Sequence, residues 1–172
     1  TAELVSRQIM KAGWNPRIEF ALHGEPTMNP QYVDIIRIFR KNLPKVSMMM
    51  TSNGGGFLFP PSVTTNINNL MEAGLNILLL DDYDATTIVK KIIKKYKGPH
   101  GVMFYPQQTE ANPHRRRKPS EHLVVICQDV SGTPGGTHGR LNNHGRGSFP
   151  GNNSLEGKRC ARVFREISVR WD

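Results

Sequence analysis

The sequence predicts an α/β protein built from repeated βα units, and two observations predict this class. Short segments with strand character alternate with segments whose apolar residues recur at helical spacing. In addition, residues 75–80 are almost wholly apolar, as expected for a parallel strand that is buried on both faces. Right-handed crossovers between such strands would place helices outside a parallel sheet. Periodicity leaves open whether this sheet is a partial barrel or an open, doubly wound sheet.

Four helices are predicted from their apolar faces and their end signals. The clearest is the last, in which Ile88, Ile92 and Tyr96 recur four residues apart with Val89 and Ile93 beside them. A glycine or proline follows each of the first three helices, where such residues commonly end a helix. The helices are expected at 2–12, at 31–43, from Pro61 up to Gly74, and at 85–96.

Five strands are predicted between these helices and after the last of them. They are expected at 17–22, 46–52, 75–80, 101–105 and 122–129. The polar and basic segment 107–120 is expected to be a loop. We interpret the run Met48–Met50 as buried strand, because methionine more often fills a core than binds a metal.

The composition changes after Pro106, and residues 131–158 are rich in glycine with asparagine, serine and proline. We therefore expect an α/β core at 1–129, an irregular Gly/Asn-rich linker at 130–156 and a further region at 157–172. Residues 165–171 alternate polar and apolar, as in a half-exposed strand. Because the chain starts with Thr1 and stops just after that strand, we expect it to be incomplete at both ends.

Composition favours a globular protein, with 37% hydrophobic and 22% charged residues in 172. No apolar run approaches the ~20 residues that cross a bilayer, and no segment has the pattern of a signal peptide. We therefore expect a cytoplasmic protein that does not enter the membrane. The net charge of +9 includes two basic clusters, at 90–97 and 114–118, which suit an anionic partner such as RNA or a phosphate-bearing cofactor. The second of these is more readily explained as a solvated loop.

The chain has two cysteines, Cys127 and Cys160, and no Cys-x-x-Cys pair. A disulfide framework is not expected in a cytosolic chain of this kind. Cys127 lies in an apolar strand and is assigned to packing. Two thiols cannot supply the three thiolates of an iron–sulfur site within these residues.

Polar residues follow each of the first three strands, where α/β folds bind ligands. His23-Gly24-Glu25-Pro26 follows the first strand; Gly24 would let a ligand approach the backbone, and Glu25 or nearby carbonyls could accept hydrogen bonds from an ammonium group. The alternative is an ordinary βα turn.

Two further groups end the next strands. Thr51-Ser52-Asn53-Gly54 ends the second strand, where its hydroxyl and amide groups suit ribose or carboxylate contacts or form a turn. Asp81 and Asp82 are expected just after the third strand, where helix capping by Asp82 or Asp84 is the preferred interpretation.

These residues resemble the core of radical S-adenosylmethionine enzymes. Residues 18–30 resemble the second strand and Gly-Gly-Glu-Pro loop of that family, with His23 in place of the first glycine. Residues 46–54 and 75–82 resemble its third and fourth strands. The resemblance implies a partial (β/α) barrel in which His23, Gly24, Glu25 and Pro26 hold the methionine amino group of S-adenosylmethionine. Ser52 and Asn53 would contact the rest of the cofactor.

A second resemblance covers residues 140–172, where an Asn-rich turn, Cys160 and a strand resemble the start of a SPASM-type extension. It implies that Cys160 ligates an auxiliary iron–sulfur cluster, and the alternative is that this lone cysteine is a packing residue. The family's main [4Fe–4S] cluster sits on a Cys-x-x-x-Cys-x-x-Cys loop that these residues lack. We therefore expect a fragment that is inert alone, from an enzyme that generates a 5′-deoxyadenosyl radical and abstracts hydrogen from its substrate.

The family resemblance also implies partners: a peptide, protein or small-molecule substrate, and an electron donor such as flavodoxin or ferredoxin. Two other functions stay open. One is a basic RNA-binding module on an α/β scaffold, whose affinity would fall steeply with salt. The other is a non-catalytic α/β domain that has lost the cluster.

Overall fold

The computed structural model describes residues 1–21, 24–82, 87–105 and 107–128. The chain divides into two compact units, Thr1–Asp129 and Val130–Asp172, and every described residue belongs to the first. The regions expected at 130–156 and 157–172 therefore lie outside the described residues, and so does the strand expected at 165–171.

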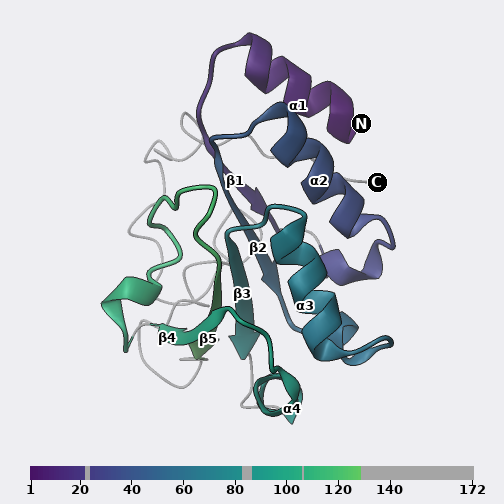
Figure 1. The fold of residues 1–172 in the computed structure, drawn as a ribbon, viewed down its shortest axis with the longest axis vertical. Coiled ribbons are helices and arrows are strands. Elements are labelled where there is room, and N and C mark those ends of the chain that lie inside the picture. The colour runs from purple at the N-terminus through teal and green to yellow at the C-terminus, as the bar shows by residue number, and fades with distance from the viewer. Residues whose placement is uncertain (22–23, 83–86, 106, 129–172) are drawn as a thin grey trace, which may run out of the picture. The chain divides into compact units, whose positions relative to one another are not determined.

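A five-stranded parallel sheet forms the centre of the first unit (Figure 1). Every neighbouring pair is parallel, and the order across the sheet is β1-β2-β3-β5-β4. The strands are β1 (Arg17–Phe20), β2 (Ser47–Ser52), β3 (Ile77–Asp82), β4 (Gly101–Tyr105) and β5 (Leu123–Gln128). The predicted α/β class with repeated βα units is confirmed.

The last two strands do not follow the chain order across the sheet. β5 lies between β3 and β4, so β4 is at the edge. The burial of β4 and β5 agrees with these positions. Val124, Val125 and Ile126 of β5 are buried, as an interior strand requires. No residue of β4 is fully buried, which suits the edge of the sheet.

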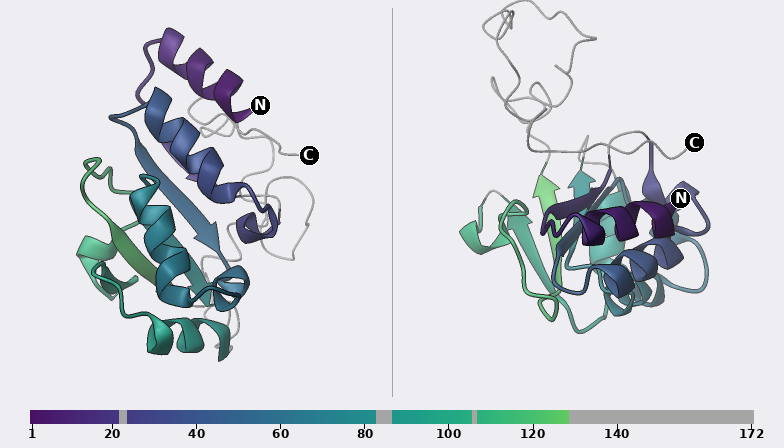
Figure 2. Two further views of the ribbon diagram at one scale, coloured as in Figure 1. Left: turned by 45° about the vertical axis from the view of Figure 1, so that its right-hand side comes forward. Right: turned by 90° about the horizontal axis from the view of Figure 1, so that it is seen from above.

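Four α-helices connect or precede the strands: α1 (Ala2–Lys11), α2 (Tyr32–Asn42), α3 (Val63–Glu72) and α4 (Thr87–Lys95). Three short 3-10 turns follow strands: η1 (Pro26–Met28), η2 (Gly55–Leu58) and η3 (Thr109–Ala111). The loop expected at 107–120 thus contains a turn, and Ala111 within it is fully buried. The views in Figure 2 show α1, α2 and α3 on the same side of the sheet.

Alternate residues of the strands pack into two apolar layers, one on each face of the sheet. Met48, Met50, Leu78 and Leu80 pack in the layer that includes the helices. Met49, Ile77, Leu79 and Val125 form a second cluster on the opposite face, together with Ala111 of η3. Burial on both faces explains why the strand sequences are continuously apolar rather than alternating.

The third strand lies two residues later than predicted, which is a correction with two causes. At its start, the amide of Leu75 donates to the carbonyl of Leu70 and so closes the end of α3. At its end, Asp81 and Asp82 pair in register with Cys127 and Gln128 of β5. Both aspartates therefore belong to β3 rather than to the segment that follows it.

Asn76 joins three parts of the sheet at its amino end and is completely buried. Its Oδ1 accepts hydrogen bonds from the amide of Met48, at 2.9 Å, and from Nη2 of Arg40, also at 2.9 Å. Its Nδ2 donates to the carbonyls of Lys118, at 2.9 Å, and Glu121, at 3.0 Å. All four hydrogen-bonding positions of this amide are thus satisfied.

Arg40 extends the same network from α2. Its guanidinium donates to the carbonyls of Gly74, at 2.7 and 3.1 Å, and Val46, at 2.8 Å. Burial lowers the pKa of Arg40 from its ordinary value. The group ties the end of α3 to the start of β2.

We predict that Asn76→Ala lowers the free energy of unfolding by about 3–5 kcal/mol, because it leaves a buried amide and two carbonyls without partners. Urea unfolding followed by circular dichroism measures the change. Asn69→Ala, on the exposed face of α3, is the matched control and stays within about 1 kcal/mol of the unsubstituted chain. Equal losses in the two variants would contradict the role given to Asn76.

A second prediction concerns pH. Burial, followed by the charge of His122, lowers the pKa of His100, and Glu72 opposes this shift. The rings of His100 and His122 lie 5.5 Å apart between centroids. A histidine whose pKa is lower in the folded state binds protons more readily when unfolded, so stability falls as pH drops below about 6.5. His100→Gln should flatten the fall in the urea midpoint between about pH 7 and 5; an unchanged slope would contradict this.

Candidate functional site at the carboxyl ends of β1 and β2

The loop after β1 and the loop after β2 meet at the carboxyl edge of the sheet. Gly24, Glu25 and Pro26 belong to the first loop, and Pro26 begins η1. Proline suits that position because it lacks an amide hydrogen that the turn would leave unpaired. Glu25 is the residue before η1, where its side chain caps the turn.

The carboxylate of Glu25 accepts hydrogen bonds from both loops. Its Oε1 accepts from the amide of Thr27 at 3.1 Å and from the Thr27 hydroxyl at 2.8 Å. The same oxygen accepts from the Ser52 hydroxyl at 2.6 Å. Its Oε2 accepts from the amide of Asn53 at 2.7 Å. Glu25 therefore caps its own turn and fastens that turn to the end of β2.

The loop after β2 is braced by its own hydrogen bonds. The Ser52 hydroxyl, which donates to Glu25, also accepts from the amide of Gly54 at 3.0 Å. Asn53 Oδ1 accepts from the amide of Gly55 at 2.8 Å. Ser52 is buried, so its hydroxyl serves the internal network on both sides.

Two glycines in this loop are required by close packing. Gly54 has φ of +82°, and a Cβ there would collide with Ile92 of α4. A Cβ on Gly56 would collide with the side chain of Thr27. The contact of Gly56 with Thr27 lets the two loops approach closely enough for Glu25 to reach Asn53.

Gly24 differs from these glycines because no described side chain crowds the position of its missing Cβ. Its φ of +90° favours glycine. An added Cβ would meet no atom of the described residues within 4 Å. A ligand could therefore approach the backbone next to the Glu25 carboxylate.

The structure brings together Glu25, Ser52 and Asn53, with Gly24 and Pro26 adjacent. His23 and Cys160 lie outside the described residues. Sequence reasoning missed Thr27 and Gly56. Thr27 follows Glu25 by two residues, a spacing that suits a capped turn, and the Gly54–Gly56 run indicates close packing without naming its partner.

The arrangement suits a cation with several N–H donors. Among the described residues, Glu25 Oε2 accepts one hydrogen bond, from Asn53, and a carboxylate oxygen has room for a second. The side-chain Nδ2 of the exposed Asn53 makes no hydrogen bond to any described residue, so it can donate to a ligand. The site thus fits an amino acid moiety, whose ammonium and carboxylate need an acceptor and a donor side by side.

The donor set does not fit an iron–sulfur cluster. No group of three or more His, Cys, Asp or Glu side chains within the described residues could hold a metal ion. The whole chain has two cysteines, fewer than the three thiolates that such a cluster takes from its loop. Within the residues that the structure describes, no helix is long and apolar enough to span a membrane.

We predict that Ser52→Ala lowers the free energy of unfolding by about 1–3 kcal/mol, because it removes a donor to Glu25 and leaves the Gly54 amide unpaired. Urea unfolding tests this, with the exposed Ser120→Ala as the control that stays within about 0.5 kcal/mol. A Ser52 variant as stable as the control would show that the bridge contributes nothing.

Comparisons with known proteins give two solved structures. No family model matches the chain, and no curated protein matches its sequence. A crystal structure of BtrN in an open conformation shares 13% identity over 76% of this chain and 44% of its own, with a TM-score of 0.47. BtrN in complex with AdoMet and 2-DOIA shares 16% identity over 77% of this chain and 44% of its own, also with a TM-score of 0.47. The chain therefore spans less than half the length of these two structures.

Proposed function

We propose that this chain is part of a radical S-adenosylmethionine enzyme and that its β1–β2 edge holds the methionine moiety of S-adenosylmethionine. One observation carries the proposal: the Glu25 carboxylate binds the end of β2 through Ser52 and Asn53 and still has room for a donor on Oε2. The Gly-Glu-Pro turn is thus more than a connection between a strand and a helix.

Each residue has a defined task in this proposal. Glu25 Oε2 accepts a hydrogen bond from the ammonium group, and Gly24 leaves the backbone open to it. Asn53 offers its amide to the carboxylate, while Ser52 orients Glu25. In this family, the bound cofactor supplies the 5′-deoxyadenosyl group that abstracts hydrogen from the substrate.

The cluster that reduces the cofactor does not fit these residues, and we derive no step through it. Its thiolates would have to come from outside the 172 residues. The substrate, whether a peptide, a protein or a small molecule, and an electron donor such as flavodoxin or ferredoxin belong to the whole protein. The assignment of Cys160 to an auxiliary cluster is likewise a proposal.

RNA binding has less support from the charge distribution. The helix α4 lies by the loop after β2 and the start of α3, since its Ile92 packs on Gly54 and the amide of Lys97 donates to the Thr64 hydroxyl. The run 114–118 lies at the other end of the strands, where the amide of Arg117 donates to Ser47 at the start of β2. The two basic clusters do not form one continuous track for a nucleic acid backbone.

We predict that Glu25→Gln weakens S-adenosylmethionine binding to the chain by about tenfold or more, because a charged acceptor of the ammonium group is lost. Isothermal titration calorimetry measures this. Glu110→Gln, an exposed residue of η3, makes the same chemical change away from the site and should leave the affinity unchanged.

A second ligand separates a local effect from misfolding. 5′-Methylthioadenosine keeps the adenosine but lacks the amino acid moiety, so Glu25→Gln should leave its binding unaltered. No binding of S-adenosylmethionine to the unsubstituted chain, or an equal loss for both ligands, would count against the proposed site.

A further inference from the structure

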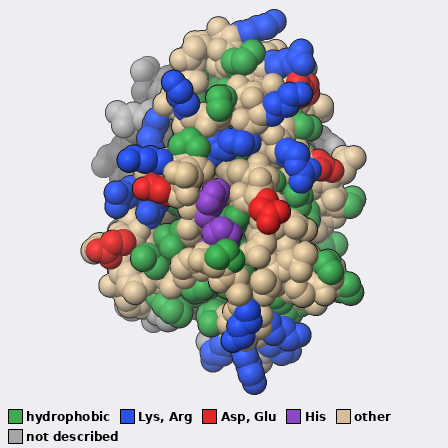
Figure 3. All heavy atoms as spheres, in the orientation of Figure 1, with side chains coloured by type: hydrophobic (Ala, Val, Ile, Leu, Met, Phe, Trp, Pro, Cys, Tyr) green, Lys and Arg blue, Asp and Glu red, His purple; other side chains and the backbone are tan. Residues whose placement is uncertain are grey.

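The helix α4 presents a face of exposed lysines. Lys90, Lys91, Lys94 and Lys95 are all exposed, and Lys97 follows them. The opposite face of the helix is apolar, with Val89 and Ile92 buried in the core. Figure 3 shows Lys and Arg side chains gathered at the end of the molecule where α4 lies in Figure 1.

These lysines have no acidic partners within the described part of the chain. The three ion pairs there join Glu3 to Arg7, Arg17 to Glu19, and Asp34 to Arg37. Lysines four apart on one helix repel each other, and the pairs 90/94 and 91/95 have this spacing. An anionic partner would relieve this repulsion.

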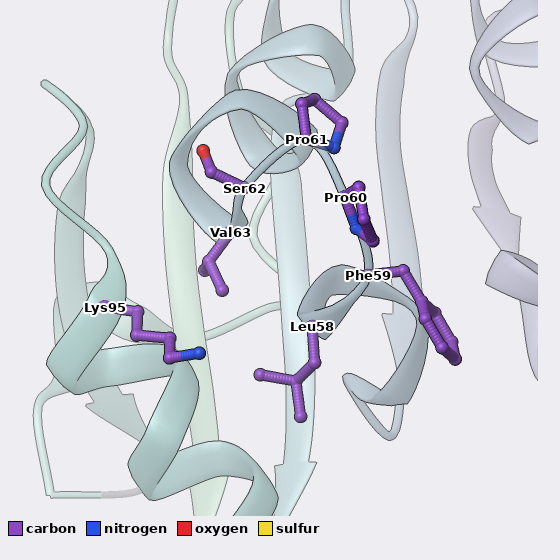
Figure 4. A pocket seen from close by; sticks show the side chains of 7 residues that line it. All are labelled: Leu58, Phe59, Pro60, Pro61, Ser62, Val63 and Lys95. Atoms are coloured by element: carbon purple, nitrogen blue, oxygen red, sulfur yellow. The ribbon is translucent and has the colours of Figure 1, made fainter.

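A hollow of about 380 Å³, whose exposed lining is part polar and part apolar, adjoins the lysine face and shares Lys95 with it. Figure 4 shows the side chains of Leu58, Val63 and Lys95 directed toward the same space, whereas Phe59 projects away from it. Pro60 and Pro61 have no amide hydrogen to offer. The Ser62 hydroxyl is engaged as the cap of α3, since it accepts from the amide of Thr65 at 3.0 Å.

We propose that the hollow and the lysine face of α4 together bind an acidic polypeptide segment that places one aliphatic side chain in the hollow. The helical rise puts residues four apart about 6 Å from each other. Alternate side chains of an extended peptide are about 6.6 Å apart. Carboxylates at alternate positions can therefore face Lys91 and Lys95 in turn. This surface is independent of the proposed cofactor site.

The chemistry of the hollow favours a polypeptide over RNA. Single-stranded nucleic acids are held by stacking on aromatic rings and by groups that read base edges. Most residues that line the hollow are aliphatic or proline, its serine is engaged, and the ring of Phe59, which also lines it, projects away from the space that Leu58 and Val63 face. Lys95 is the charged group that lines it.

The test uses the full chain and a fluorescein-labelled peptide with glutamate at alternate positions and one central leucine. Fluorescence anisotropy should report binding that weakens with salt. The double variant Lys91→Glu/Lys95→Glu should reduce the affinity about tenfold or more. Lys11→Glu/Lys45→Glu makes the same change in net charge at exposed positions elsewhere and should leave the affinity within about twofold.

Replacing the central leucine of the peptide by serine tests the hollow without altering the protein. We expect an affinity about tenfold lower, because a buried leucine is lost. Four results would overturn the proposal: no binding of the leucine peptide, an equal loss in both double variants, equal affinity of the serine peptide, or tighter binding of a short oligouridylate at the same lysines. Circular dichroism confirms that each variant is folded.

Discussion

The side-chain amide of Asn76 is the interaction on which the sheet depends. It holds the amide of Met48 at the start of β2 and the carbonyls of Lys118 and Glu121 before β5. Its four hydrogen bonds exist together in one register of β2, β3 and β5. A slip of one residue would turn every side chain of a strand to the opposite face of the sheet. The buried amide therefore fixes which side chains point into each of the two apolar layers. Arg40 supports the same register, because it donates hydrogen bonds to Asn76 and to the carbonyls of Val46, before β2, and Gly74, before β3.

The carboxyl edge of the sheet follows from that register. With Met48 fixed beside Asn76, Ser52 pairs with Leu80, and β1 pairs through Phe20 with Met50. The loops after β1 and β2 then emerge side by side, within reach of the Glu25 carboxylate. Glu25 joins these loops as Asn76 joins the strands at the other end. In both cases, one polar side chain accepts or donates hydrogen bonds across elements that are distant in the sequence.

Most of the fold could be predicted from local patterns, because apolar periodicity and end signals are properties of short segments. The strand order could not, since nothing within residues 101–128 states that β5 enters between β3 and β4. Asn76 is a single polar residue in an apolar run, and its partners lie far away in the chain. The edge residues Glu25, Ser52 and Asn53 were predicted from their positions after strands. Their mutual hydrogen bonds, and the close contact of Gly56 with Thr27, depend on tertiary packing that periodicity does not encode.

The two proposed binding surfaces differ in how far they are organised before a ligand arrives. Glu25 is held by four hydrogen bonds, two of them from backbone amides, so the direction of its remaining acceptor position is set. Such preorganisation favours a small cation at short range, because little side-chain entropy is lost on binding. The lysines of α4 are exposed and flexible, and their charges act over roughly a Debye length, about 8 Å at physiological salt. They are suited to attracting an acidic chain, and in the proposal the hollow beside Lys95 distinguishes one such chain from another.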